Sequence, residues 1–347
     1  MDDDAIAGWL IPSEFMDVNY GSAVKEYLLN KVTLLRIHRF EPEDVQFGDA
    51  LVSSAVVWFR KAKPPERHCV QFTYGGALGH PKQEGSVPVE SLWGERKWTR
   101  LPAQARKADS NRPTLGDFFV IKRGIATGDN KFFILTQDQL RERGLSANHF
   151  RPILPSPRHL NIGEILADDD GNPKIAPALF LLNCSLPEET LRDRHPALWR
   201  YLETGKSDVS ERYLCRHRSP WYIQENRPPA PFLCTYMGRG NGNGKPPFRF
   251  ILNHSRATAA NVYLLLYPRK PLERVLQSDP ALQGKIWKIL KEIAPASMVQ
   301  EGRVYGGGLY KLEPKELASV PAERIAALLP EVRITTAIQR TLFEMIS

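Results

Sequence analysis

The stretch TLGDFFVIKRGIATGDNKFFILT, residues 114–136, decides how the rest of the chain is interpreted. Two apolar runs, each holding a pair of phenylalanines, flank a turn that contains Gly, Thr and Asn, and this pattern indicates strand, loop and strand. The loop carries Lys122, Arg123, Thr127 and Asn130, whose side chains suit contacts with phosphates and base edges. An ordinary hairpin with solvated basic side chains fits the segment equally well, so the flanking sequence has to decide.

Composition places the chain among globular proteins of about two domains. Its 347 residues are 42% hydrophobic and 25% charged, as in soluble proteins generally. No apolar run approaches the ~18 residues that a membrane span needs, and the acidic start MDDDAIAGW lacks a secretory signal pattern. The four cysteines stand far apart without a C-x-x-C pair, which indicates neither a disulfide framework nor a zinc ribbon. We therefore expect a cytoplasmic protein with no membrane contact.

The charge of the chain favours a polyanionic partner. Its formal net charge is +8, from 47 Lys and Arg against 39 acids, although many soluble proteins are this basic without binding a polyanion. The distribution is more informative, because residues 212–256 hold seven Arg and one Lys with Glu225 as the sole acid. Arg216, Arg218 and Arg239 belong to this basic segment.

The N-terminal part of the chain predicts the strands and helix of an α/β sheet. Apolar runs at Ile6–Ile11, Thr33–Phe40 and Leu51–Phe59 are typical of strands, and Tyr20–Lys31 has the periodicity of an amphipathic helix. Three strands and one helix cannot bury both faces of a sheet. We therefore expect residues 1–62 to be the edge of a larger α/β domain that does not stand alone.

Two further regions follow in the chain. Residues 63–112 are rich in Pro, Gly, Lys and Arg and indicate a linker with short β segments. Residues 113–347 mix strand, helix and turn signals, among them a glycine-rich turn at 238–247, and predict an α+β domain. The expected fold class is therefore an α/β remnant followed by an α+β domain.

Two blocks of the sequence resemble a known family. The first block, residues 8–61, runs from GWLIPSEFMD to SSAVVWFRK, and the other joins TLGDFFVIKRGIATG, residues 114–128, to YGGGLYKLEPKELASVPA, residues 305–322. Both are similar to segments of TaqI-like, adenine-specific DNA methyltransferases of restriction–modification systems. In the order of that family, the first block is similar to the last strands of the Rossmann-like catalytic sheet. The other block resembles the start and end of the target-recognition domain.

The resemblance implies S-adenosylmethionine as methyl donor, double-stranded DNA as substrate, and transfer to the N6 amine of a flipped adenine. The family's Gly-rich cofactor turn and its Asn-Pro-Pro-Tyr motif are missing, because GRGNGNG, residues 238–244, follows no strand-to-helix unit. The similar KPPF, residues 245–248, begins with a lysine, which cannot accept hydrogen bonds from an adenine amine. We therefore expect the C-terminal portion of a methyltransferase, inactive without an N-terminal half or a catalytic subunit. A non-catalytic DNA-specificity subunit and an inactive remnant are the alternatives.

Phe47 is the residue that the resemblance places nearest the chemistry. A base inside a duplex has to be flipped out before it reacts, and a flipped base needs an aromatic face on which to stack. The family carries an aromatic residue in the loop before its final strand, and Phe47 of QFGDALVSSAVV matches that position. The alternative is a core phenylalanine that covers the end of the sheet.

The predicted DNA contacts combine cations, amides and aromatic rings. Asn and Arg side chains pair with the edges of adenine and guanine. Surfaces that bind along the nucleic-acid backbone combine cations with aromatic rings. The three glycines before Tyr310 allow the protein backbone to come close to DNA. For each residue, a solvated surface position or a packed turn is the alternative. The candidates are Lys122, Arg123, Thr127, Asn130, Arg216, Arg218, Arg239, Asn253, Arg256, Tyr310 and Lys311.

The sequence predicts no metal site and no catalytic constellation of its own. Cys215, His217, Cys234 and His254 lack the regular spacing of zinc ligands. The acidic run at residues 168–170 lacks the downstream glutamate of a calcium loop and indicates a solvated turn.

Overall fold

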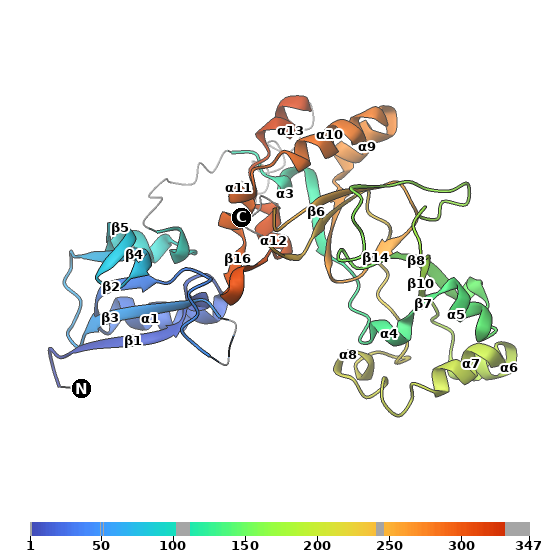
Figure 1. The fold of residues 1–347 in the computed structure, drawn as a ribbon, viewed down its shortest axis with the longest axis horizontal. Helices are drawn as coiled ribbons and strands as arrows, with labels where there is room; N and C mark the ends of the chain where they lie inside the picture. Colours follow the sequence, from blue (N-terminus) through green and yellow to red (C-terminus); the bar gives the residue numbers. More distant parts are fainter. Residues whose placement is uncertain (1, 49, 51, 102–111, 241–245, 330–347) are drawn as a thin grey trace, which may run out of the picture. The chain divides into compact units, whose positions relative to one another are not determined.

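The computed structural model describes residues 2–48, 50, 52–101, 112–240 and 246–329 (Figure 1). The chain divides into two compact units, each of which is made of separate chain segments. The first unit comprises residues 1–112, 238–247 and 295–312, and the second comprises residues 113–237, 248–294 and 313–347.

A five-stranded mixed sheet forms the framework of the first unit, in the order β1-β3-β2-β4-β5. Strand β3 lies between β1 and β2 and is antiparallel to both, so β1 and β2 run in the same direction. Strand β4 is parallel to β2, and β5 returns beside it as a hairpin. The carboxyl ends of β1, β2 and β4 therefore meet at one edge of the sheet. The bounds are β1 Ile6–Pro12, β2 Thr33–Arg39, β3 Ser54–Arg60, β4 Cys69–Ala77 and β5 His80–Pro88.

The core of this unit packs helix α1 against the sheet. Leu28 and Leu29 of the helix are buried in one cluster with Leu34 and Ile37 of β2 and with Trp98. Val24, which lies four residues before Leu28, packs against the same cluster, and this spacing is that of an amphipathic helix laid on a sheet. The helical elements of this part are η1 Ser13–Met16, η2 Asn19–Gly21, α1 Ser22–Asn30, α2 Val89–Gly94 and η3 Trp98–Arg100.

A late segment of the chain returns to complete the first unit. Ser53 donates a hydrogen bond to the carbonyl of Val304 at 2.6 Å, and the amide of Gly307 donates to the carbonyl of Pro42 at 2.8 Å. The Lys97 ammonium also donates to the carbonyl of Glu301. The returning elements are α11 Pro295–Glu301, β16 Arg303–Tyr305, η5 Gly306–Gly308 and β17 Leu309–Lys311, with β12 Met237–Arg239 beside β17.

Two sheets build the second unit. One has the order β14-β8-β10-β7 and the other the order β6-β15-β11-β13-β9. Their strands are β6 Phe119–Arg123, β7 Ile134–Thr136, β8 Phe150–Leu154, β9 Glu164–Ile165, β10 Leu179–Leu182, β11 Phe232–Thr235, β13 Phe250–Asn253, β14 Thr258–Ala259 and β15 Tyr263–Pro268. The helices are α3 Leu115–Phe118, α4 Asn130–Phe133, α5 Gln137–Glu142, η4 Ala147–His149, α6 Glu188–Arg194, α7 Pro196–Glu203, α8 Tyr213–Arg216, α9 Lys270–Ser278, α10 Ala281–Lys291, α12 Pro314–Ala318 and α13 Glu323–Leu328.

The expected N-terminal strands and helix are present within a few residues of their predicted bounds. Residues 69–88 differ from the expected short β segments, because they form two nine-residue strands of the main sheet. The signal for β4 was the buried pair Val70 and Phe72, whereas β5 is a polar edge strand whose side chains are mostly exposed. Polar edge strands carry little hydrophobic alternation for a sequence pattern to detect.

The hairpin interpretation of residues 114–136 is wrong. Strand β6 pairs with β15, whereas β7 belongs to the other sheet of the second unit. Between them the chain forms helix α4, which begins because the Asp129 carboxylate accepts hydrogen bonds from the amides of Lys131 and Phe132 at 2.8 and 3.2 Å. This is the usual contact of a residue that caps a helix N-terminus.

Candidate nucleic-acid interface

The segment of residues 124–131, here called the recognition loop, follows β6 in the second unit and includes the first two residues of α4. Its inner side is fixed by Thr127, which is buried and donates from its hydroxyl to the amide oxygen of Asn130 at 2.7 Å. Its outer side presents Lys131, which is exposed beside Asn130. The loop therefore holds a donor-bearing edge in a defined shape.

Helix α8 and the residues beside it hold the recognition loop in place. Arg218 donates from its two terminal nitrogens to the carbonyls of Ala126 and Thr127, at 2.6 and 2.8 Å. Arg212 forms an ion pair with Asp129 at 2.5 Å. Because Arg218 satisfies two backbone carbonyls, its charge stabilises the loop from inside the chain.

An open cavity of about 470 Å³ lies between the recognition loop and helix α8. Asn130, Lys131, Arg212 and Asn261 supply polar groups to its wall, and Leu214 supplies an apolar edge. Amide, ammonium and guanidinium groups are donors to phosphates and to base edges.

Arg123 is held in one orientation at the end of β6. Its Nε atom donates to the carbonyl of Asn261 at 3.0 Å, and its guanidinium carbon lies 4.0 Å from the centre of the Tyr236 ring. The side chain is exposed, as is that of Lys122 next to it. A guanidinium that is fixed before binding loses less conformational freedom when it meets a partner.

The remaining candidates of the second unit differ in how they are used. Asn253 is buried, and its amide donates to the carbonyls of Ala230 and Ala257 while its oxygen accepts from the hydroxyl of Ser255. Asn253 is therefore satisfied inside the fold, and we leave it out of the proposed contacts. Exposed Arg256 is bound to Asn172 at 2.9 Å.

Arg216 of α8 is exposed on the second unit. Arg239 is exposed on β12, beside strand β17.

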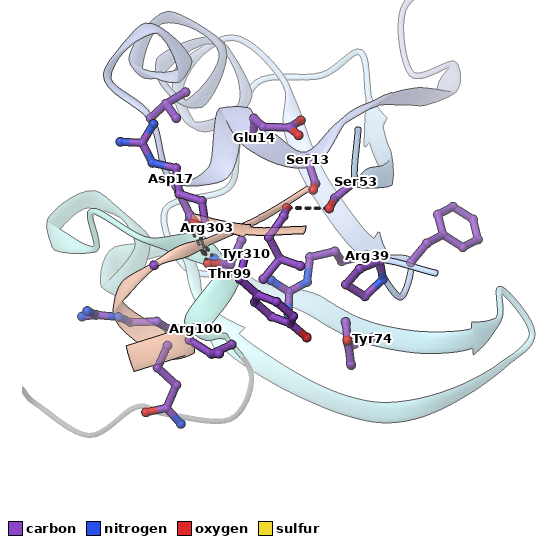
Figure 2. A pocket seen from close by; sticks show the side chains of 17 residues that line it. Ser13, Glu14, Asp17, Arg39, Ser53, Tyr74, Thr99, Arg100, Arg303 and Tyr310 are labelled. Atoms are coloured by element: carbon purple, nitrogen blue, oxygen red, sulfur yellow. Dashed lines mark hydrogen bonds between the residues drawn. The ribbon is translucent and has the colours of Figure 1, made fainter. Parts of the chain in front are cut away.

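The first unit has its own cavity of about 200 Å³, at the edge where β1, β2 and β4 present their carboxyl ends (Figure 2). Arg39 extends from the end of β2 into the cavity, where Tyr310 of β17 also lies (Figure 2). The Arg39 guanidinium is 4.6 Å from the centre of the Tyr74 ring. Burial lowers the pKa of Arg39 and raises the pKa values of Tyr74 and Tyr310.

Glu14 brings a buried carboxyl group to the same cavity. Both of its carboxylate oxygens are shielded from solvent and make no well-formed hydrogen bond among the described residues. Burial raises the pKa of Glu14, with a smaller contribution from Asp17, although the nearby amides of Glu14 and Ser53 offset part of the effect. A carboxyl in this position holds its proton to a higher pH than an exposed one.

Phe47 lies in the loop between β2 and β3 and is half-buried. Phe40 and Pro42, from the start of the same loop, line the cavity. Lys311 follows Tyr310 on β17 and pairs in register with Arg303. The placement of Phe47 leaves its role in stacking a prediction.

The turns after β1 and β2 do not fit S-adenosylmethionine. The turn after β1 enters the short helix η1 through Pro12, and β2 runs into Phe40, Glu41 and Pro42. Neither turn has the glycines that let a backbone approach a cofactor. Residues 241–245 of the GRGNGNGK segment lie outside the described residues. The described residues also hold no group of three or more His, Cys, Asp or Glu placed to bind a metal.

Sequence reasoning missed Arg39 and Glu14. In the sequence, Arg39 is one residue of a predicted strand and Glu14 is part of the turn after another. The sequence around Arg39 does not show that its side chain points into the protein, because the pattern TLLRIHRF is that of any half-buried strand. The nearest available signal was that Arg39 lies at the end of one predicted strand and Glu14 closely follows another.

Comparison with known proteins identifies the family of the chain. Residues 99–342 match the model of the C-terminal domain of the type II methyltransferase M.Eco57I. The chain belongs to this family. The resemblance seen in the sequence, to the C-terminal part of a restriction–modification methyltransferase, is thereby confirmed.

Two curated relatives extend the match to most of the chain. M.XamI of Xanthomonas campestris pv. amaranthicola, a type II methyltransferase, is 28% identical over 90% of this chain and 55% of its own length. M.AccI of Acinetobacter calcoaceticus, also a type II methyltransferase, is 26% identical over 89% of this chain and 57% of its own length. The chain thus spans about half the length of these relatives.

Solved structures of restriction–modification enzymes are more distant. The type IIL enzyme MmeI in complex with DNA matches 78% of this chain and 34% of its own, with 12% identity and a TM-score of 0.43. The type IIG restriction endonuclease BpuSI matches 97% of this chain and 42% of its own, with 14% identity and a TM-score of 0.36.

Across the residues described, no helix combines the length and apolar character needed to cross a bilayer.

Proposed function

We propose that this chain supplies target recognition to a restriction–modification DNA methyltransferase that modifies the N6 amine of adenine. The observation that carries the proposal is the recognition loop, whose backbone is locked from within by Arg218 while Asn130 and Lys131 line the open cavity beside it. A rigid loop with available donors is what sequence-specific contact with a duplex requires. Membership of the methyltransferase family supports the same function.

The proposed division of labour gives each set of residues one task. Exposed Lys122, Lys131 and Arg216 bind phosphates, whereas Arg123 and Asn130 reach base edges. Phe47 stacks on the flipped adenine. The N-terminal half of the methyltransferase, in the same protein or in a separate chain, binds S-adenosylmethionine and performs the transfer.

Strand β1 is the proposed site for that N-terminal half. Within the described residues, β1 lies at the end of its sheet and pairs with β3 alone. It carries exposed apolar side chains, with Ile6 60% and Leu10 44% accessible. An unpaired edge strand with exposed apolar side chains is suited to take a further strand.

Duplex binding by the chain alone tests the recognition role. We expect the logarithm of the affinity to fall linearly with the logarithm of the salt concentration, because lysine and arginine side chains that bind phosphates release counterions from DNA. An affinity that does not change between low and high salt would overturn the assignment of phosphate contacts.

Methyl transfer tests the rest of the proposal. Labelled S-adenosylmethionine and unmethylated duplex are incubated with the chain, with and without the N-terminal half supplied separately. We expect transfer to adenine only in the presence of both parts.

Substitution Phe47→Ala should lower kcat in the assembled enzyme while Phe47→Trp retains it, because tryptophan also offers a stacking face. Transfer by the chain alone would overturn the division of labour, and equal kcat for Phe47→Ala would remove the stacking role.

A further inference from the structure

We propose that Tyr213 inserts its ring into the DNA base stack beside the recognition loop. This inference rests on the proposed function and adds to it a residue whose contact with DNA depends on whether the base pairs are fully stacked. Tyr213 opens helix α8, and its side chain is 71% exposed. Leu214, the next residue, is 38% exposed and lies at the edge of the cavity beside the recognition loop.

The Tyr213 ring is presented in a fixed orientation. It packs on the imidazole of His217, with 4.5 Å between the ring centres, and the Nδ1 atom of His217 is 2.6 Å from the carbonyl oxygen of Tyr213. The helix itself is anchored by Cys215, which is fully buried against the recognition loop. An exposed ring that is already ordered loses little conformational freedom when it inserts.

The surroundings of Tyr213 suit a polyanion. Arg216 is exposed on the same helix, and Lys131 is exposed on the recognition loop. The nearby acids Asp129 and Asp208 are engaged by Arg212, at 2.5 and 3.1 Å, and the exposed Glu211 accepts a hydrogen bond from the Ser210 hydroxyl at 3.4 Å. Arg216 and Lys131 form no ion pair among the described residues, and these two available cations favour DNA over a neutral protein surface as the occupant of this face.

Insertion has a specific consequence for DNA choice. A ring enters the stack at the cost of separating two base pairs, and this cost is smallest where a base is missing or mispaired. A chain that inserts Tyr213 should therefore bind a duplex with one abasic site more tightly than the intact duplex. Stacking of an aromatic side chain on bases corresponds to a difference of about tenfold in affinity.

The test measures the affinity of the full chain for a duplex with a central abasic site and for the same duplex intact. Tyr213→Ala should lose the preference for the abasic duplex, and Tyr213→Phe should keep it, because the phenyl ring stacks without the hydroxyl. Tyr20→Ala is the matched control, because Tyr20 is 73% exposed in the first unit. This control should keep the preference of the unmodified chain.

The outcomes distinguish the insertion of Tyr213 from the proposed function. Loss of the preference in Tyr213→Ala alone supports insertion. Equal preference in Tyr213→Ala and the unmodified chain, with tight duplex binding in both, overturns insertion and leaves the proposed function intact. Absence of duplex binding by the unmodified chain overturns both. Equal losses in Tyr213→Ala and Tyr20→Ala also overturn insertion, because a general surface effect would then explain them.

Discussion

The sulfur atom of Cys215 occupies the space into which a side chain at position 128 would project. A β-carbon built on Gly128 would lie 2.6 Å from the Sγ atom, and Gly128 has a φ of +93° that other residues rarely adopt. Gly128 therefore meets two requirements at once, a left-handed backbone and a close approach to α8. The recognition loop and helix α8 are therefore packed directly against each other.

Gly128→Ala should destabilise the second unit by more than the backbone cost of about 1–2 kcal/mol, because the new methyl group also meets Cys215. Gly144→Ala is the matched control, since Gly144 has a φ of +62° and a β-carbon added there would meet no atom within 4 Å. Thermal unfolding of the two variants measures the difference. In a double-mutant cycle, Cys215→Ala should recover part of the Gly128→Ala loss, and strict additivity would contradict the steric contact.

Arg216 and Arg218 should behave in opposite ways although they are two residues apart. Arg218→Ala leaves the carbonyls of Ala126 and Thr127 without their donor, so we expect a loss of about 2–3 kcal/mol of stability. Arg216→Ala should change stability by less than about 0.5 kcal/mol. It should also reduce the slope of the logarithm of the duplex affinity against the logarithm of the salt concentration by about 1, because one phosphate contact is lost. Chemical denaturation and salt titrations measure both, and equal stabilities would contradict the internal role of Arg218.

Glu14→Gln should stabilise the first unit at neutral pH. Because burial raises the pKa of Glu14 above its ordinary value of 4.5, the folded chain binds this proton more tightly than the unfolded chain. The unmodified protein therefore loses stability as the pH rises from 4.5 through the raised pKa, and the glutamine variant does not. The difference in Tm between the two proteins should be present at pH ~8 and vanish below pH ~4, where the carboxyl is protonated in both states. A difference that is constant with pH would contradict this origin.

Asn253→Ala should reduce stability and leave the DNA sequence preference unchanged. The substitution removes a buried amide that bonds Ala230, Ser255 and Ala257, and unpaired buried groups cost about 1–3 kcal/mol each. The measurements are the Tm and the ranking of affinities over a panel of duplexes. An altered ranking with an unchanged Tm would restore Asn253 as a base-reading residue.

The elements that the sequence predicts well are those whose patterns are local. Strands β1, β2 and β3 and helix α1 follow from apolar periodicity, and they lie within a few residues of their predicted positions. Helix α4 resembles part of a hairpin in the sequence because its cap, Asp129, acts over only three residues beside two phenylalanines. Short capped turns compete poorly with an apolar run in any pattern-based prediction.

The role that each candidate side chain has within the fold could not be predicted from the sequence. An arginine that donates to internal carbonyls and one that faces solvent are identical in the sequence, as Arg218 and Arg216 show. The amide of Asn253 is likewise used within the fold. Which donors remain available depends on tertiary hydrogen bonds, which form between residues far apart in the chain.

The hydrogen bond between Ser53 and Val304 links residues 251 positions apart, with most of the second unit encoded between them. During synthesis, the N-terminal sheet leaves the ribosome long before the segment that completes its unit exists. The first unit can therefore close only after residues 295–312 have been made, and a gene fusion that stops at residue 112 would deliver the sheet without this closing segment. Exchange of the second unit between relatives would consequently have to leave residues 238–247 and 295–312 in place, because both segments belong to the first unit.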